Sequence, residues 1–412
     1  MRYVCIRFML VQNTKRKGIF TMKKILAILL CLCMVLAVVA CNKTENTTEE
    51  TTVADTTAAA TTEAATEAST EETTTAGDEV TEVEYKLGMG IVVDTASSTS
   101  ATADAAGNAQ VDATVAAVVL DKDGKIVSCR IDAVQNKIAV AADGTLTMPE
   151  AFQTKMEKGD AYGMAAAVNY GMDWNGDGVV KEWYDQAKAF EAYVVGKTAA
   201  EVEAMATQTL SNGYVISSED ALLTAGCTIQ ITEFKAAVVK ACQDDQAMSF
   251  KTASAFTLGV AATSADNGST SATAEANGSV QVYSDFAAAV VVDGKVIATL
   301  NDAIQPKIAI TAEGAIDATT FNGTKRELKE GYNMAAFGAP NVEGGTVKEW
   351  YIQSAAFSAY VVGKTATEIA SMETTLVNNH YISVEADLLA AGCTMQITGI
   401  CAVVSTAANN AR

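Results

Sequence analysis

Hydrophobic and polar residues alternate with two different periods along this chain. Residues 114–120 are apolar and rich in valine, and residues 125–131 form a second run of this kind. Between them, residues 121–124 have the Asp, Lys and Gly composition of a tight hairpin turn. The pattern therefore predicts a pair of antiparallel strands in this part of the chain.

Further along the chain the period becomes helical. Apolar residues share one face of a predicted helix at Trp183, Ala187, Phe190 and Val194. Gly196 stands where this helix is expected to end. Thr198 and Glu201 then form a capping-box pattern that predicts a short second helix, and Thr365 and Glu368 repeat it.

The last part of this segment predicts a short strand at residues 227–231 and a further apolar helix that begins at Thr232. Strands and helices thus occupy separate stretches of the chain and do not alternate strictly. This arrangement favours the α+β class, with antiparallel strands packed against helices.

The sequence contains an internal repeat. Several segments of residues 84–246 recur in the same order in residues 252–407. The clearest matches are 132–138 with 302–308, 181–184 with 348–351, 193–198 with 360–365, and 222–232 with 388–398. The chain is therefore expected to hold two copies of one small domain, at residues 84–246 and 252–407.

Residues 1–41 predict export and lipid attachment. Two lysines after Met22 precede an apolar run at residues 25–39, which is the layout of a secretory signal peptide that starts at Met22. Residues 38–41 resemble the lipobox of bacterial lipoproteins, so a lipid on Cys41 is expected to hold the protein at the extracellular face of the cell membrane. The alternative is an uncleaved membrane helix, but the apolar run is shorter than the ~20 residues that a span requires.

Residues 42–83 consist almost entirely of Thr, Glu, Ala and Ser. Such a segment cannot bury enough apolar surface to offset the entropy of ordering, so a disordered stalk is expected. Its acids contribute to a formal net charge of −20 over 412 residues. This charge argues against binding of nucleic acid through a basic face.

Cysteine and histidine content excludes two kinds of chemistry. Besides Cys41, the expected mature chain has five cysteines, Cys129, Cys227, Cys242, Cys393 and Cys401, of which only two are in equivalent places. An odd, unmatched set does not form a duplicated disulfide framework. The single histidine, His380, aligns with Gly213 of the first copy. A Ser-His-Asp or Cys-His mechanism that was duplicated with the domain is therefore excluded. We expect His380 on a surface loop.

A candidate calcium loop occurs in the first copy. Asp173, Asn175 and Asp177 place oxygen ligands at alternate positions, with glycine at the sixth position for the sharp turn. Tyr184 stands at the twelfth position, where a bidentate glutamate belongs, and the second copy lacks the ligand set. Two interpretations stay open: a calcium site in the first copy alone, or a polar turn without an ion.

The strongest local feature is a run of small residues before a threonine, at 225–228 and again at 391–394. Backbone amides in such a run can approach an anion closely, and we expect the threonine hydroxyl to be exposed. A tight structural turn would account for the glycine alone. The aromatic pair at residues 183–184 could contact a cofactor, but its helical spacing favours a place in the core.

The order of these segments resembles the FMN-binding domain of lipoproteins that act in extracellular electron transfer in Gram-positive bacteria. The resemblance covers nearly all of both copies. It implies that a flavin transferase links FMN through a phosphoester to Thr228 and Thr394, next to the further cofactor-binding candidates Gly226, Cys227, Gly392 and Cys393. This chain departs from the family motif: alanine replaces its serine, cysteine replaces its alanine, and Asp220 and Asp387 lie farther upstream than expected.

The resemblance also implies a function. A carrier of this kind receives electrons from a membrane donor and passes them through its two flavins to an external acceptor, with the chemistry supplied by the flavin. The alternative is a flavin-free surface module of the same fold that binds a partner or serves as structure. A hydrolytic enzyme is the least supported interpretation.

Overall fold

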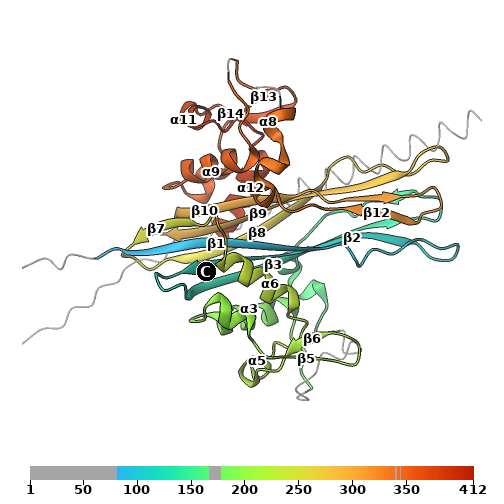
Figure 1. Cartoon of the computed structure of the whole chain (residues 1–412), viewed down its shortest axis with the longest axis horizontal. Coiled ribbons are helices and arrows are strands. Elements are labelled where there is room, and N and C mark those ends of the chain that lie inside the picture. The colour runs from blue at the N-terminus through green and yellow to red at the C-terminus, as the bar shows by residue number, and fades with distance from the viewer. Residues whose placement is uncertain (1–80, 167–177, 339–340, 344) are drawn as a thin grey trace, which may run out of the picture. The chain divides into compact units, whose positions relative to one another are not determined.

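The computed structural model describes residues 81–412, apart from 167–177, 339–340 and 344. The α+β class is confirmed, because the described chain combines antiparallel sheets with helices (Figure 1). The predicted signal peptide, Cys41 and most of the predicted stalk lie outside the described residues. Within the described part of the chain, no helix is both long enough and apolar enough to cross a membrane.

The first repeat forms a five-stranded antiparallel sheet in the order β4-β3-β2-β1-β7. Its strands are β1 (Val83–Asp94), β2 (Gly107–Leu120), β3 (Ile126–Val140), β4 (Leu146–Thr147) and β7 (Met248–Thr252). Its helices are α2 (Lys155–Lys158), η1 (Gly159–Tyr162), α3 (Trp183–Val194), α4 (Ala199–Glu203), α5 (Asp220–Thr224) and α6 (Thr232–Cys242). A small hairpin of β5 (Thr207–Thr209) and β6 (Val215–Ser217) lies between α4 and α5 in the sequence.

The second repeat builds a matching sheet around its longest strand. This strand, β9 (Gly278–Val292), pairs with β8 (Thr257–Asp266) and also with β10 (Lys295–Ile304) and β11 (Lys307–Ile310), while β12 (Ile316–Thr320) pairs with β11. Its helices are α7 (Lys325–Leu328), η3 (Lys329–Tyr332), α8 (Met334–Phe337), α9 (Trp350–Tyr360), α10 (Ala366–Ala370), α11 (Ala386–Ala390) and α12 (Thr398–Asn409). A hairpin of β13 (Thr374–Val377) and β14 (His380–Ser383) corresponds to β5 and β6.

One difference between the sheets follows from a single residue. In the first repeat β3 is continuous over 15 residues, whereas the second repeat divides the equivalent stretch into β10 and β11. Pro306 lies at the break, where the first repeat has Asn136. Proline lacks a backbone N–H and cannot donate to a strand ladder, so the strand is interrupted there.

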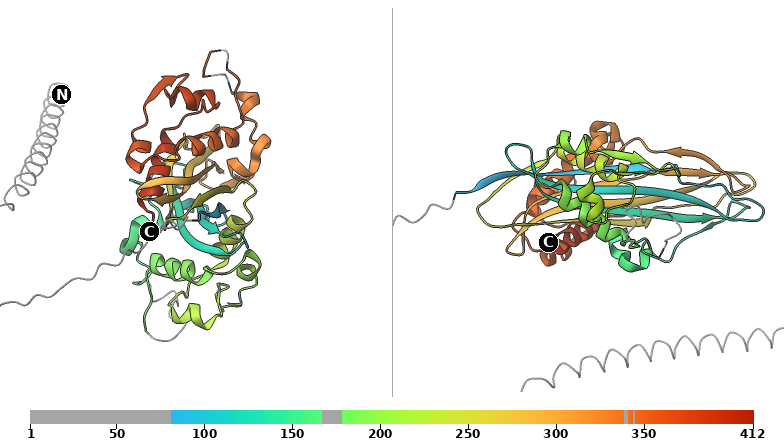
Figure 2. Two further views of the ribbon diagram at one scale, coloured as in Figure 1. Left: turned by 90° about the vertical axis from the view of Figure 1, so that its left-hand side faces the viewer. Right: turned by 90° about the horizontal axis from the view of Figure 1, so that it is seen from below.

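The two sheets share one hydrophobic core. Alternate residues of β2 and β9 point into it, namely Val115, Ala117, Val119, Phe286, Ala288 and Val290. The intervening residues of β2 pack against the helices of their own repeat. Figures 1 and 2 show the helices of the two repeats on opposite sides of the paired sheets. Because both faces of this part of β2 are buried, residues 115–120 form an unbroken apolar run.

Most local predictions are confirmed. Residues 121–124 form the turn between β2 and β3. The predicted helix is α3, and Gly196 follows it with a φ of +83°. Thr198 and Thr365 each begin a helix with both bonds of the capping box present. Thr232 is the first residue of α6.

The strand predicted at residues 227–231 is wrong. This segment is an irregular link between α5 and α6. The backbone N–H groups of Thr228 and Ile229 donate to Oε1 of Gln186 at 2.8 and 3.0 Å, so a side chain and not a neighbouring strand accepts their hydrogen bonds. Its apolar residues are buried among helices, which gives the segment a strand-like composition.

The closest helix-to-sheet contacts predict the effect of two substitutions. A Cβ atom on Gly88 would overlap the carbonyl oxygen of Ala241 in α6, and one on Gly259 would overlap that of Ala407 in α12. Gly88→Ala and Gly259→Ala should each lower the free energy of unfolding by about 2–3 kcal/mol, since the helix must move away from the strand. Urea denaturation measures this. Gly331→Ala, with open space around its Cβ position, is the control, and equal losses in all three variants would contradict the packing argument.

Candidate functional site

The small-residue run of the first repeat is a helix cap. Helix α5 ends at Thr224, Ala225 is its C-cap residue, and Gly226 has a φ of +82°. The N–H of Gly226 donates to the carbonyl of Leu223 at 2.8 Å, and the N–H of Cys227 donates to that of Leu222 at 3.1 Å. This bond pair is the Schellman cap, which requires a left-handed residue and so accounts for the glycine.

The second repeat builds the same cap at Gly392, with a φ of +87°. In each copy a lysine side chain crosses the glycine and donates to the preceding carbonyl: Lys181 Nζ to Ala225 O, and Lys348 Nζ to Ala391 O, both at 2.9 Å. A Cβ on either glycine would overlap the lysine side chain. The glycines therefore admit a lysine that closes the end of the helix.

The two candidate flavin-accepting threonines are buried, contrary to the expected exposure. Thr228 is 3% exposed and Thr394 is 7% exposed. In the second repeat the N–H groups of Thr394 and Met395 both donate to Oε1 of Gln353 at 2.8 Å, as Gln186 does in the first. A buried glutamine, Gln186 of α3 or Gln353 of α9, thus binds the backbone of each threonine segment and keeps the segment in the protein interior.

Cys227 and Cys393 are poor candidates for flavin attachment through sulfur. Both side chains are fully buried. Burial raises the pKa of each thiol to about 12, because the thiolate would lose its hydration. The reactive thiolate is therefore scarce at neutral pH. All five cysteines in the described part of the chain are free.

A cavity of about 430 Å³ opens beside the threonine segment of the second repeat. Met395, the residue after Thr394, lines it. Three aromatic side chains form much of its apolar wall: Tyr283 of β9, Tyr332 of η3 and Trp350 of α9. Polar side chains at its edges include Gln305, Asn379 and Gln396. An apolar hollow with a few polar groups is the usual form of a small-molecule site.

Lys325 lies among these rings. Its Nζ is 4.6 Å from the ring centres of Tyr283 and Tyr332 and 5.5 Å from that of Trp350. It also donates to Tyr283 Oη at 3.1 Å. In the first repeat, Lys155 stands in the equivalent place, 5.2 Å from Tyr162 and 5.5 Å from Trp183. This lysine-aromatic cluster therefore belongs to both repeats, and cation–π attraction stabilises it.

A buried carboxyl group also lines the second-repeat cavity. Asp285 of β9 is 8% exposed. Burial raises its pKa to about 7, although the positive charge of Lys325 and a hydrogen bond from Tyr283 act in the opposite direction. The ionisation of this group is therefore moved from the acidic range toward neutral pH.

His380 contributes to the rim of the same cavity. It is exposed, as expected, but it is the first residue of β14 and not part of a loop. Sequence reasoning overlooked Lys325 and Asp285. The pair Thr324-Lys325 recurs as Thr154-Lys155 and could have indicated the lysine. Asp285 is not repeated at the equivalent position of the first copy, so the sequence gave no signal for it.

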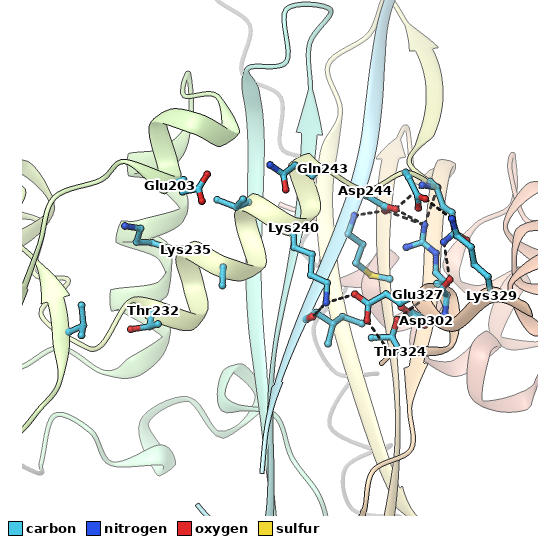
Figure 3. A pocket seen from close by; sticks show the side chains of 18 of the residues that line it. Glu203, Thr232, Lys235, Lys240, Gln243, Asp244, Asp302, Thr324, Glu327 and Lys329 are labelled. Carbon is cyan, nitrogen blue, oxygen red and sulfur yellow. Dashed lines mark hydrogen bonds and ion pairs between the residues drawn. The ribbon is translucent and has the colours of Figure 1, made fainter. Parts of the chain in front are cut away.

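A second cavity, of about 760 Å³, lies where α6 of the first repeat faces α7 of the second. Figure 3 shows the side chain of Lys240 extending from α6 toward Glu327, while Glu203 and Lys235 lie apart from this pair. Three ion pairs in this region join the repeats: Lys240 with Glu327, Arg326 with Asp244, and Lys329 with Asp245. Because these charges already neutralise one another, we interpret this region as the junction of the repeats.

No cluster of three or more His, Cys, Asp or Glu residues suited to a metal ion occurs among the described residues. The candidate calcium ligands Asp173, Asn175 and Asp177 lie outside those residues. Calcium binding by the first repeat stays a prediction.

Comparison with known proteins gives one local similarity. No family model and no solved structure matches this chain. A chlorophenol reductase from Desulfitobacterium hafniense is 34% identical over 103 residues, which is 22% of this chain and 29% of the relative. The match thus covers less than a third of either protein.

Proposed function

We propose that this chain is a lipid-anchored electron carrier of the extracellular membrane face that holds one FMN covalently in each repeat, at Thr228 and Thr394. The observation that carries the proposal is the aromatic cavity beside Thr394, with Met395 in its wall. The order of sequence motifs that resembles FMN-binding domains supports it independently.

The second-repeat residues suit a flavin in size and chemistry. A volume of about 430 Å³ falls in the range of small-molecule pockets, and three aromatic side chains offer flat apolar surface to a fused ring system. Gln305 and Gln396 provide amide groups for polar ring edges. Bound FMN would supply the redox chemistry. Lys325 would place a positive charge near added electrons, and Gln353 would keep the threonine segment in position.

The partners of such a carrier are a flavin transferase, a membrane electron donor and an external electron acceptor. A lipid on Cys41 and a stalk at residues 42–83 would let the folded repeats move between donor and acceptor. Covalent attachment suits this location, because a dissociable cofactor would be lost by dilution outside the cell.

A flavin-free surface module is the second candidate function. The burial of both threonines favours it, since a transferase needs access to the hydroxyl and neither side chain is more than 7% exposed. Flavin attachment would therefore require the threonine segment to open. Asn341, whose side-chain Nδ2 donates to Thr394 O at 2.8 Å, is one contact that must break if the segment moves.

Substitution of the two threonines distinguishes the flavin carrier from the flavin-free surface module. When the chain is coexpressed with a flavin transferase, Thr228→Val and Thr394→Val should each remove one FMN mass, and the double variant should be colourless. Valine keeps the β-branched shape while it deletes the oxygen that forms the phosphoester. Intact-protein mass spectrometry and visible absorption after denaturation measure attachment.

The matched control is the double variant Cys227→Ala and Cys393→Ala, which should retain both flavins because the buried thiols are protonated. Loss of flavin from this variant, with retention in the threonine variants, would move the attachment to sulfur. A wild-type chain without covalent flavin would favour the surface-module alternative.

A further inference from the structure

The equivalent strands β2 and β9 of the two repeats differ at two positions that face the helices, and both positions of β9 line the cavity of the second repeat. Asp285 of β9 pairs with Ala303, and Thr114 of β2 pairs with Ala133. Ala303 and Ala133 follow the equivalent aspartates of the matched segments 302–308 and 132–138. Asp285 and Thr114 are therefore structural counterparts. By the same register Tyr283 corresponds to Asp112, so the first repeat has its carboxyl group two residues earlier on the strand.

A second difference makes room for this carboxyl group. Gly399 is the second residue of α12, and Glu233 is the second residue of α6. A Cβ on Gly399 would lie 2.5 Å from Oδ2 of Asp285, so any larger side chain would collide with the carboxylate. The aspartate and the glycine thus form a complementary pair that exists in the second repeat alone.

The surroundings of Asp285 connect it to the cavity and to a positive charge. Tyr283 of β9 donates a hydrogen bond to the carboxyl group and accepts one from Lys325 of α7 at 3.1 Å. The other acidic group that acts on it is Asp302 of β10, whose charge opposes ionisation of Asp285. Tyr332 of η3 lies on the other side of Lys325, 4.6 Å from its Nζ. Lysine, tyrosine and aspartate therefore form a continuous polar chain at the cavity wall.

We propose that Asp285 is the proton-exchanging residue of the second-repeat cavity, and that the first repeat has no counterpart for this role. The inference rests on the proposed flavin function and adds to it that the two flavins differ: reduction of the second is coupled to a protein carboxyl group, and reduction of the first is not.

Two electrons would enter from the membrane donor, or from dithionite in an assay. With FMN bound, Asp285 would give up the proton of its O–H group to the ring as the electrons arrive, and the second proton would come from water. Lys325 would stabilise the carboxylate that is left, and the carboxylate would regain its proton when an external acceptor removes the electrons. A pKa near 7 suits a group that gives and takes protons at neutral pH.

The test isolates the second flavin. In the Thr228→Val background, which leaves flavin on Thr394 alone, the midpoint potential is measured by spectroelectrochemistry between about pH 5 and pH 9. Because the reduced flavin ring itself ionises near neutral pH, the plot of potential against pH bends in any case, and Asp285→Asn should change the position and shape of that bend. Asp285→Thr, which places the first-repeat residue in the second repeat, should do the same.

Two further measurements complete the experiment. In the Thr394→Val background, Thr114→Val should leave the potential curve of the first flavin unchanged. In flavin-free protein, infrared spectroscopy should show a carboxylic-acid band that titrates near neutral pH and is lost in Asp285→Asn, which checks proton exchange without flavin.

The outcomes separate the two proposals. If flavin is bound to Thr394 but Asp285→Asn leaves the curve of potential against pH unchanged, the inference is wrong while the carrier function stands. A carboxyl band that does not titrate in this range also overturns it. Absence of covalent flavin overturns the carrier function and, with it, the coupling to Asp285.

Discussion

Arg326→Met should lower the free energy of unfolding by about 3–5 kcal/mol, because it leaves a buried carboxylate without its partner. Arg326 and Asp244 are each 7% exposed. Nη2 of Arg326 donates to both carboxylate oxygens of Asp244 at 3.1 Å and to the carbonyl of Gln246 at 3.0 Å. Since Asp244 follows α6 of the first repeat and Arg326 lies in α7 of the second, the loss should loosen the junction of the repeats.

A neighbouring ion pair provides the control for this experiment. Lys329 and Asp245 also connect the repeats, at 2.5 Å, but their side chains are 38% and 68% exposed. Lys329→Met should therefore cost less than about 1 kcal/mol. The double variant Arg326→Met with Asp244→Leu should recover part of the loss, because no unpaired charge is left. Equal losses for Arg326→Met and Lys329→Met in urea denaturation would show that burial does not set the strength of this contact.

The folded chain should become less stable as the pH rises from about 5 to about 8, because three buried carboxyl groups favour the protonated form. Burial raises the pKa of Asp132 and Asp285 to about 7 and that of Asp302 to about 6. An unfolded aspartate has a pKa of about 3.9, so the folded state binds more protons in this range. The stabilisation is fully present below the unfolded pKa and is lost as pH rises through the folded value.

Above pH 5 the expected loss is about 3 kcal/mol each for Asp132 and Asp285 and about 1 kcal/mol for Asp302, because one pKa unit corresponds to ~1.4 kcal/mol. Urea denaturation at several pH values measures the slope. Asp132→Asn should flatten the curve, since its asparagine does not titrate. Asp123→Asn is the control, because its side chain is 62% exposed and its removal should leave the slope unchanged. A wild-type curve that rises with pH in this window would contradict the prediction.

The sequence alone was sufficient for features that depend on near neighbours in the chain. The turn at residues 121–124, the helix from Trp183 and the capping boxes at Thr198 and Thr365 all depend on backbone preference and on contacts within a few residues. The repeat was evident for the same reason, since equivalent elements need equivalent local patterns.

Features that join distant segments required the tertiary structure. Residues 227–231 have the apolar composition of a strand, but Gln186 accepts the hydrogen bonds of Thr228 and Ile229 from 42 and 43 residues away and keeps them out of any ladder. The same contact, together with close packing, buries Thr228, although a small-residue run before it suggested an exposed hydroxyl. The composition of a segment indicates which secondary structures it can adopt, whereas tertiary packing determines which of its groups are exposed to solvent.

The shared core and the cavity were also decided by the tertiary structure. The apolar run of β2 predicts that both of its faces are buried, but it does not identify the elements that pack on them. The structure shows helices of the same repeat on one face and the sheet of the other repeat on the second face. Likewise, Asp285, Lys325 and Gly399 are separated along the chain and become one group only where β9, α7 and α12 meet. The sequence by itself determined the local elements and their duplication. The pairing of distant surfaces determined the junction, the cavity and the ionisation of its carboxyl group, because burial and charge neighbours exist only in the folded chain.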